Sequence, residues 1–289
     1  MLAASAPIVF VFIWSTGWVV AKYAMPYADP LTFLFVRYVV AALLLGGLIA
    51  VARARLPQNR AEWFHAVFSG VFLHALYLGG VWWAIARGVP AGISALIAAL
   101  QPLITLVLAT ALKTERPGAI QMAGILLGFM GVLGVVWPKL APDAMAGAAA
   151  LGPQITLNAL AMVSVVIGTL YQKRYLVGHD LRSVAALQYV GAALATLPLA
   201  LLLEPMRFEP VTETWLALAW SVLVLSIGAI MLMLWMIRRG AVSKLASLIY
   251  LVPPVVALQA YAMFGETLMP VQILFMGVTA LGVYLANRK

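Results

Sequence analysis

The chain has 289 residues, of which 65% are hydrophobic and only 9% are charged, and its mean hydropathy is +1.04. Soluble globular domains carry about 25% charged residues, so this composition excludes a soluble fold and predicts an integral membrane protein. The sequence contains no cysteine, which excludes disulfides, thiolate metal ligands and cysteine nucleophiles. Its net charge of +9 is not gathered into a basic run or domain, so binding of nucleic acid is not expected.

Ten apolar stretches, separated by charged residues or by Pro and Gly, predict an all-α membrane protein with ten transmembrane helices. Each helix needs about 20 residues to cross the hydrocarbon core, so no room remains for a soluble catalytic domain. The first stretch lacks a preceding basic segment and is expected to be a retained helix. The predicted helices cover residues 6–24, 31–52, 64–86, 91–112, 118–137, 155–172, 183–203, 215–237, 243–263 and 270–286.

The first of these helices carries Trp14, Ser15 and Trp18 well inside its ends. Aromatic walls suit aromatic or cationic solutes, so these three residues are candidates for a substrate cavity. Tryptophan also anchors helices at the membrane interface, which is the alternative interpretation of the two indoles.

The third helix carries His74 and Tyr77, which are three residues apart and share a face. A histidine inside a membrane indicates a polar cavity or a proton relay. A neutral imidazole bonded to a neighbouring side chain is the alternative. Both residues are candidates for the substrate cavity.

The fourth helix contains Ser94 and Gln101, seven residues apart on one face, followed by Pro102. Polar side chains are costly against lipid and are expected to face the protein interior. Proline removes a backbone N–H and frees the carbonyl four residues earlier. We therefore expect a kink that serves as a hinge or exposes an acceptor to substrate, with a simple packing kink as the alternative.

The ninth helix repeats this pattern of polar residues before proline. Its candidate cavity residues are Ser243, Ser247 and Tyr250, and its candidate hinge residues are Pro253 and Pro254. The three polar residues fall at i, i+4 and i+7 and so share one helix face.

The distribution of Lys and Arg predicts the orientation of the chain. With the N-terminus in the cytoplasm, 13 of the 18 basic residues fall in inside loops or at the C-terminus, four fall outside, and Arg37 falls within the second helix. Cytoplasmic loops are enriched in Lys and Arg. Both termini are therefore expected in the cytoplasm, which requires an even number of helices.

The two halves of the sequence are related by a nearly constant offset. Lys22, Asp29 and Tyr38 find the same residue type 151 positions later, and the offset is 152 for Arg87 and Pro102. We expect two five-helix repeats, residues 1–150 and 151–289. Because five is odd, the second repeat must enter the membrane from the opposite side, and inverted repeats are typical of secondary transporters.

These segments resemble EamA-type members of the drug/metabolite transporter superfamily. The resemblance rests on IWSTGWVVAK in helix 1, RYVVAALLL in helix 2, and on SALIAALQPLITLVLATALKTERPGAIQMAGILLGFMGVLGVV in helices 4 and 5. The last two helices repeat that pattern, although Glu266-Thr267 replaces Glu115-Arg116. The resemblance implies a ten-helix inverted-repeat carrier that exports amino acids or related metabolites, with the aromatic amino-acid exporters as the most similar branch.

The expected function is therefore a multi-pass carrier of the inner membrane, exporting small metabolites, foremost aromatic or other neutral amino acids, by alternating access. No Asp or Glu lies in the middle of a predicted helix, which favours facilitative uniport over ion coupling. The partners are a small-molecule substrate and the lipid bilayer; no cofactor or metal is expected. A monomer and a homodimer are both compatible with the sequence.

Three alternatives stay open. Proton-coupled efflux of drugs or metabolites would use His74. Transport of phosphate esters would need several basic residues in the cavity, where the sequence offers Arg37 and Lys244. An intramembrane serine enzyme would need a base beside Ser94, and the sequence offers only His74 on the preceding helix. An enzyme is not expected.

Overall fold

The computed structural model describes residues 2–111, 118–140, 151–238 and 251–286. Regular structure within these ranges is helical, apart from one isolated β-bridge between Ala28 and Phe208. Seven helical stretches there are long and apolar enough to cross a membrane, and three shorter apolar helices cover 119–135, 252–264 and 270–286. The fold class is therefore that of an all-helical membrane protein.

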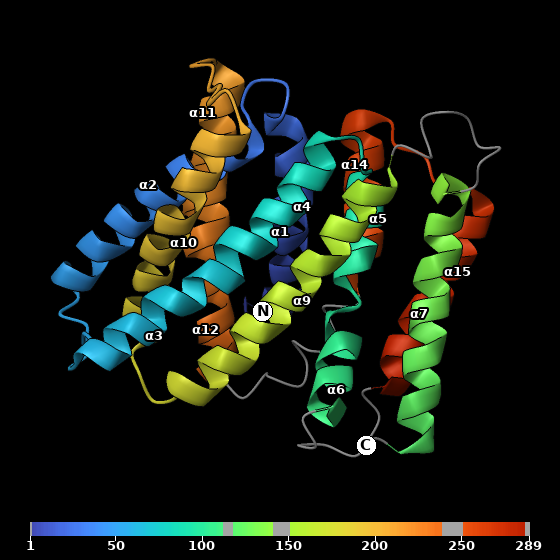
Figure 1. Ribbon diagram of the computed structural model, residues 1–289, viewed down its shortest axis with the longest axis horizontal. Helices are drawn as coiled ribbons and strands as arrows, with labels where there is room; N and C mark the ends of the chain where they lie inside the picture. Colours follow the sequence, from blue (N-terminus) through green and yellow to red (C-terminus); the bar gives the residue numbers. More distant parts are fainter. Residues whose placement is uncertain (1, 112–117, 141–150, 239–250, 287–289) are drawn as a thin grey trace. The chain divides into compact units, whose positions relative to one another are not determined.

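Figure 1 shows the helices, whose bounds lie within a few residues of the predicted stretches wherever both ends are described. Those of the first half are α1 (Leu2–Ala24), α2 (Pro30–Val51), α3 (Arg60–Gly70), the π-helical η1 (Val71–Leu76), α4 (Tyr77–Ala86), α5 (Ala91–Ala98), α6 (Gln101–Ala111) and α7 (Ala119–Leu140). Those of the second half are α9 (Gly152–Tyr175), α10 (Leu181–Leu203), α11 (Thr212–Ala219), the π-helical η2 (Trp220–Ala229), α12 (Ile230–Arg238), α14 (Val252–Phe264) and α15 (Pro270–Ala286).

The chain forms two compact units, and each takes segments from both halves of the sequence. Unit 1 comprises residues 1–19, 87–162 and 232–289, and unit 2 comprises residues 20–86 and 163–231. Each half of the sequence is therefore divided between the two units.

In unit 1, α7 and α15 pack closely through small residues. A Cβ on Gly124 would overlap the backbone of Gly282 and Ala286, and a Cβ on Gly131 would overlap Thr279. Such glycines let the backbones of membrane helices approach each other. Gln272 of α15 adds a polar contact, because its Nε2 donates to the carbonyl oxygen of Val135 over 3.0 Å.

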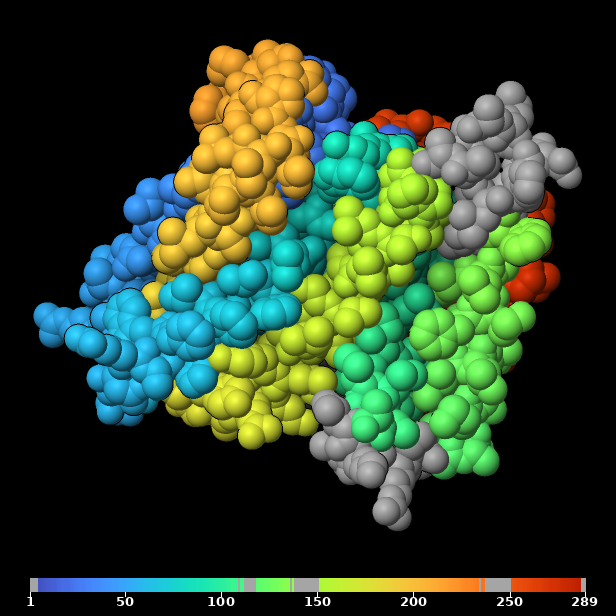
Figure 2. All heavy atoms as spheres, viewed as in Figure 1, coloured from blue at the N-terminus to red at the C-terminus, as the bar shows by residue number. Residues whose placement is uncertain are grey.

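In unit 2, α10 packs against α2 and crosses α3 and η1. A Cβ on Gly70 would overlap the backbone carbonyl of Gln188, and a Cβ on Gly191 would overlap that of Val67. The two glycines therefore set the closeness of this crossing. Figures 1 and 2 show α3, in light blue, alongside the C-terminal half of α9, in yellow-green, where the ring of His65 lies 5.6 Å from that of Tyr171.

One end of unit 2 is tied together by polar contacts between its two chain segments. The Glu204 carboxylate accepts hydrogen bonds from the backbone N–H groups of Leu31 and Thr32, both at 2.9 Å, and from the Thr32 hydroxyl. The Asp29 carboxylate accepts from the backbone N–H of Arg207 at 2.8 Å, and the Asp29 N–H donates to the Arg207 carbonyl. The first turn of α2 is thereby fastened to the segment that follows α10.

Large apolar side chains cover the outward-facing sides of the helices in both units. Leu43 on α2, Leu126 on α7 and Leu202 on α10 are each more than 60% exposed. Soluble monomers rarely expose such extended apolar surface, whereas helices in contact with lipid do so. The surface agrees with the membrane location that the composition predicts.

Candidate functional site

The predicted site residues fall in both units. In unit 1, Ser15 is fully buried and Trp18 is 6% exposed, while Trp14 stacks on Phe10 with ring centroids 5.3 Å apart. The Ser15 Oγ and the Trp18 Nε1 are buried without a hydrogen-bond partner among the described residues. Buried polar groups normally have partners, so these two atoms are available to a polar solute or to water.

The fourth predicted helix is interrupted where proline was expected to kink it. α5 ends at Ala98 and α6 begins at Gln101, with Pro102 in its first turn. Ser94 on α5 is fully buried, and its Oγ accepts a 2.8 Å hydrogen bond from Asn158 of α9. Asn158 is not among the residues predicted for the site, and its other amide atom, Oδ1, is buried without a partner among the residues described.

The ninth predicted helix is described only in part. Ser243, Ser247 and Tyr250 lie outside the described residues. Pro253 and Pro254 lie in the first turn of α14, where a proline costs no hydrogen bond because the first N–H groups of a helix have no partner within it.

Unit 2 holds a buried arginine. Arg37 of α2 is 6% exposed, its Nε donates to the Ser226 Oγ of η2 at 3.2 Å, and its guanidinium carbon lies 6.0 Å from the ring centroid of Trp82. Trp82 is itself held by Phe33, whose ring is stacked 5.0 Å away. No Asp or Glu pairs with Arg37 among the residues that the structure describes.

Aromatic rings pack beside this arginine. The His74 ring stacks on Tyr189 with centroids 4.6 Å apart, and Tyr189 stacks on Tyr38 at 5.9 Å. The Tyr38 hydroxyl donates to the His74 carbonyl oxygen at 2.9 Å, and the Tyr189 hydroxyl interacts with both Arg37 and Ser226. Tyr77, predicted to share a face with His74, opens α4 and is half-buried.

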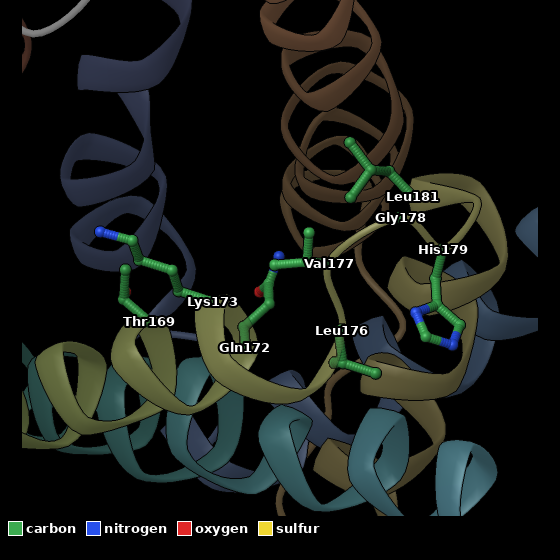
Figure 3. A pocket seen from close by; sticks show the side chains of 8 residues that line it. All are labelled: Thr169, Gln172, Lys173, Leu176, Val177, Gly178, His179 and Leu181. Atoms are coloured by element: carbon green, nitrogen blue, oxygen red, sulfur yellow. The ribbon is translucent and has the colours of Figure 1, made fainter.

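Arg37, Tyr38, His74 and Tyr189 form a cluster, and Gln188 connects this cluster to the protein surface. Its Nε2 donates to Ser69 and to the Gln172 side chain, each at 3.0 Å, and its amide also interacts with the His74 ring. Gln172 lines a pocket of about 360 Å³ at the end of α9, together with Thr169, Lys173, Leu176, Val177, Gly178, His179 and Leu181 (Figure 3). Polar side chains thus lead from this pocket toward Arg37 entirely within unit 2.

The cluster reflects the offset between the halves of the sequence. At the offset of 151, Arg37 corresponds to Gln188, and the two stacked tyrosines correspond to each other. At the offset of 152, which also relates the first residues of α3 and α11, His74 in η1 corresponds to Ser226 in η2. The contact of Arg37 with Ser226 is therefore matched by that of Gln188 with His74.

In the sequence, His74 and Arg37 stand out separately as polar residues within apolar stretches, whereas their neighbours in the structure do not. Gln188, Tyr189 and Ser226 were not among the candidates. The offset between the halves was the available signal, because it relates Gln188 to Arg37. Among the described residues, no three His, Asp or Glu side chains come together as ligands for a metal ion.

Comparison with known proteins gives a consistent pattern. The model of the EamA-like transporter family matches residues 1–137 and 153–288. The chain is 26% identical over 281 residues to the WAT1-related protein At3g02690, chloroplastic, of Arabidopsis thaliana, covering 96% of this chain and 67% of that protein.

Two bacterial proteins are similar over most of their length. The uncharacterized inner membrane transporter YedA of Escherichia coli K12 is 25% identical, with 95% of this chain and 87% of that protein aligned. A "probable amino-acid metabolite efflux pump" of Salmonella typhimurium is 26% identical, over 95% of this chain and 91% of that protein. One solved crystal structure has the same fold, with a TM-score of 0.67, 21% identity, and coverage of 99% of this chain and 96% of the other.

Proposed function

The chain belongs to the EamA-like transporter family, and we propose that it exports small metabolites, foremost amino acids, across the inner membrane. The similarity to a protein named as a probable amino-acid metabolite efflux pump carries this proposal. The similarity to an inner membrane transporter supports the location. Membership of a transporter family argues against a catalytic function.

We further propose ten membrane spans with both termini in the cytoplasm. The seven long and three shorter apolar helices of the described residues support this number. The family model matches once before residue 138 and once after residue 152, which supports two repeats, 1–150 and 151–289. Alternating access would then exchange the conformations of the two inverted repeats.

The proposed transport is facilitative. In the structure, Glu204 and Glu213 lie at helix ends, and no Asp or Glu of the sequence falls in the middle of a predicted span. Coupled carriers usually need a carboxylate within the membrane or a carbonyl-built ion site. His74 is the one histidine of the predicted cavity, and histidine is the side chain most often used to carry protons, so proton-coupled efflux is the second candidate.

The substrate cavity is proposed to include polar and aromatic residues from several helices. The Ser15 Oγ and the Trp18 Nε1, which have no hydrogen-bond partner within the described ranges, support the assignment of α1. The break between α5 and α6 supports Pro102 as a hinge. The full proposed set is Trp14, Ser15, Trp18, His74, Tyr77, Ser94, Gln101, Ser243, Ser247 and Tyr250, with hinges at Pro102, Pro253 and Pro254.

Uptake of labelled amino acids into proteoliposomes without an ion gradient tests the proposal. We expect saturable uptake that reaches equal concentrations on both sides and does not accumulate when a proton gradient is imposed. Gln101→Ala should lower the initial rate, whereas Gln121→Ala, at the exposed start of α7, should not. Accumulation driven by protons would favour the coupled mechanism, and no uptake of any amino acid would overturn the proposed substrate class.

A further inference from the structure

We infer that Arg37 recognises the carboxylate of the transported solute, so that this carrier selects acids and zwitterions over the corresponding amines and amides. The inference rests on the proposed function and adds the substrate group that is recognised. It is carried by one observation: a buried guanidinium inside a membrane helix has no acidic partner in the described structure.

A buried charge needs a counter-charge. Taking an unpaired ion out of water is strongly unfavourable, and charged side chains within membranes face the protein interior and pair with one another or with substrates. Arg37 lies seven residues beyond Pro30, at the start of α2, or about 10 Å along the helix axis at ~1.5 Å per residue. The position of Arg37 is therefore not explained by a side chain that extends to the water at the membrane surface.

The two carboxylates bonded at the N-terminal end of α2 are already engaged. Asp29 is bonded to the backbone of Arg207, and Glu204 accepts three hydrogen bonds from the first turn of α2. Neither forms an ion pair with Arg37 in the described structure. The counter-charge must therefore come from outside these groups, and a transported anion is the natural source in a carrier.

The charge is not required for packing. Gln188 occupies the corresponding position in the second half, equally buried and on the equivalent helix. A neutral side chain that forms hydrogen bonds is therefore sufficient to fill this position in the fold. The arginine adds a charge to one half only.

The geometry around Arg37 suits a carboxylate. Its Nε donates to Ser226, which leaves the four N–H groups of the two Nη nitrogens for other acceptors. Of these acceptors the described residues supply the Tyr189 hydroxyl and no carboxylate. The Trp82 ring lies over the guanidinium and limits its movement, and a planar guanidinium can bind a carboxylate through two parallel hydrogen bonds.

The test compares solutes that differ only in this group. The uptake of labelled phenylalanine or leucine into proteoliposomes is measured in the presence of an unlabelled competitor. The competitors are phenylalanine and leucine, which carry the carboxylate, and phenylalaninamide and leucinamide, which lack it. For the wild type we expect the acids to compete about tenfold or more better than the amides, the range for a charged hydrogen bond. Arg37→Gln should transport more slowly and lose this preference, and Arg37→Lys should keep part of it because Lys retains the charge without the planar fork.

Arg174→Gln is the matched control, because Arg174 is exposed on α9 and also lies over an aromatic ring, that of Tyr175. It should keep the wild-type preference. Equal competition by acids and amides in the wild type would overturn the inference while the proposed function stands, and this comparison needs no variant. An unchanged preference in Arg37→Gln would also overturn it. Absence of amino-acid uptake would overturn the proposed function and this inference with it.

Discussion

Glu204 illustrates how one carboxylate at a membrane boundary can serve the fold. Both of its oxygens accept hydrogen bonds from the first turn of α2, where backbone N–H groups lack partners within the helix. The partial positive charge at a helix N-terminus favours a carboxylate there. Glu204 therefore acts as an N-terminal cap supplied by a distant part of the chain, and this role accounts for its half-buried position.

Replacing Glu204 by Ala should destabilise the protein by about 1–2 kcal/mol, because two backbone donors and the Thr32 hydroxyl lose their acceptor. The measurement is the midpoint of thermal unfolding in detergent. Glu213→Ala is the control, since Glu213 lies in the first turn of α11 and no hydrogen bond to its side chain is seen in the described structure. Equal melting temperatures for the two variants would show that the cap contributes nothing measurable.

At the scale of elements, the crossing of α3 and α10 depends on residues without side chains. Gly70 and Gly191 each face a backbone carbonyl of the opposite helix. Because these neighbours are backbone atoms, a new methyl group cannot be accommodated by a change of side-chain rotamer. The two helices would have to move apart, and contacts such as that of Gln188 with Ser69 would be lost.

Gly191→Ala should therefore lower the unfolding free energy by about 1–3 kcal/mol, the usual cost of overpacking a close contact. Gly46→Ala on α2 is the control, because a Cβ there meets no atom of the described residues within 4 Å and alanine favours the helix. Thermal unfolding in detergent distinguishes the two. A Gly191→Ala protein as stable as the wild type would mean that the crossing can relax.

Most helix bounds could be predicted from the sequence, because hydropathy alone fixes where a chain enters and leaves a membrane. The predicted 31–52 became Pro30–Val51, and the predicted 270–286 became Pro270–Ala286. The break before Pro102 followed from the chemistry of proline. The π-helical segments η1 and η2 carry no comparable local signal, because a shift in hydrogen-bond register depends on packing against neighbouring helices.

The site was less predictable than the helices. A polar residue within an apolar helix marks His74 in the sequence, but the stack of its ring on Tyr189 is visible only in the structure. The bond between Arg37 and Ser226 joins residues 189 positions apart, and neither hydropathy nor spacing reports such a pairing. Sequence patterns identify costly residues in a membrane, whereas their partners depend on how the helices pack.

At the scale of the whole molecule, the two compact units and the two proposed repeats divide the chain differently. Unit 2 combines α2, α3 and α4 with α10 and α11, so helices of the first repeat pack against those of the second within one body. Contacts such as that of Glu204 with α2 join the repeats inside this unit. Motion during transport is therefore expected to leave these contacts intact.

The orientation in the membrane can be tested directly, because the chain has no cysteine of its own. Gln58→Cys lies between the second and third predicted helices, and Pro210→Cys lies between the seventh and eighth; both positions are exposed. In cells whose outer membrane has been removed but whose inner membrane is intact, an impermeant maleimide should label Pro210→Cys but not Gln58→Cys. After permeabilisation of the inner membrane, it should label both variants. The reverse pattern would place both termini outside, and labelling of both in intact cells would contradict the proposed topology.

The presence of different residues, Arg37 and Gln188, at equivalent positions of the two halves has an evolutionary consequence. If the two halves descend from a half-length ancestor that worked as an antiparallel pair, every side chain was present twice. The neighbouring residues Tyr38 and Tyr189 stack on each other, so two arginines at positions 37 and 188 would lie in one cluster and repel each other across a medium of low dielectric constant. Joining the two copies into one gene removed that constraint, because the copies could then differ. A charge carried by one half alone is a feature that a symmetric ancestor could not have had.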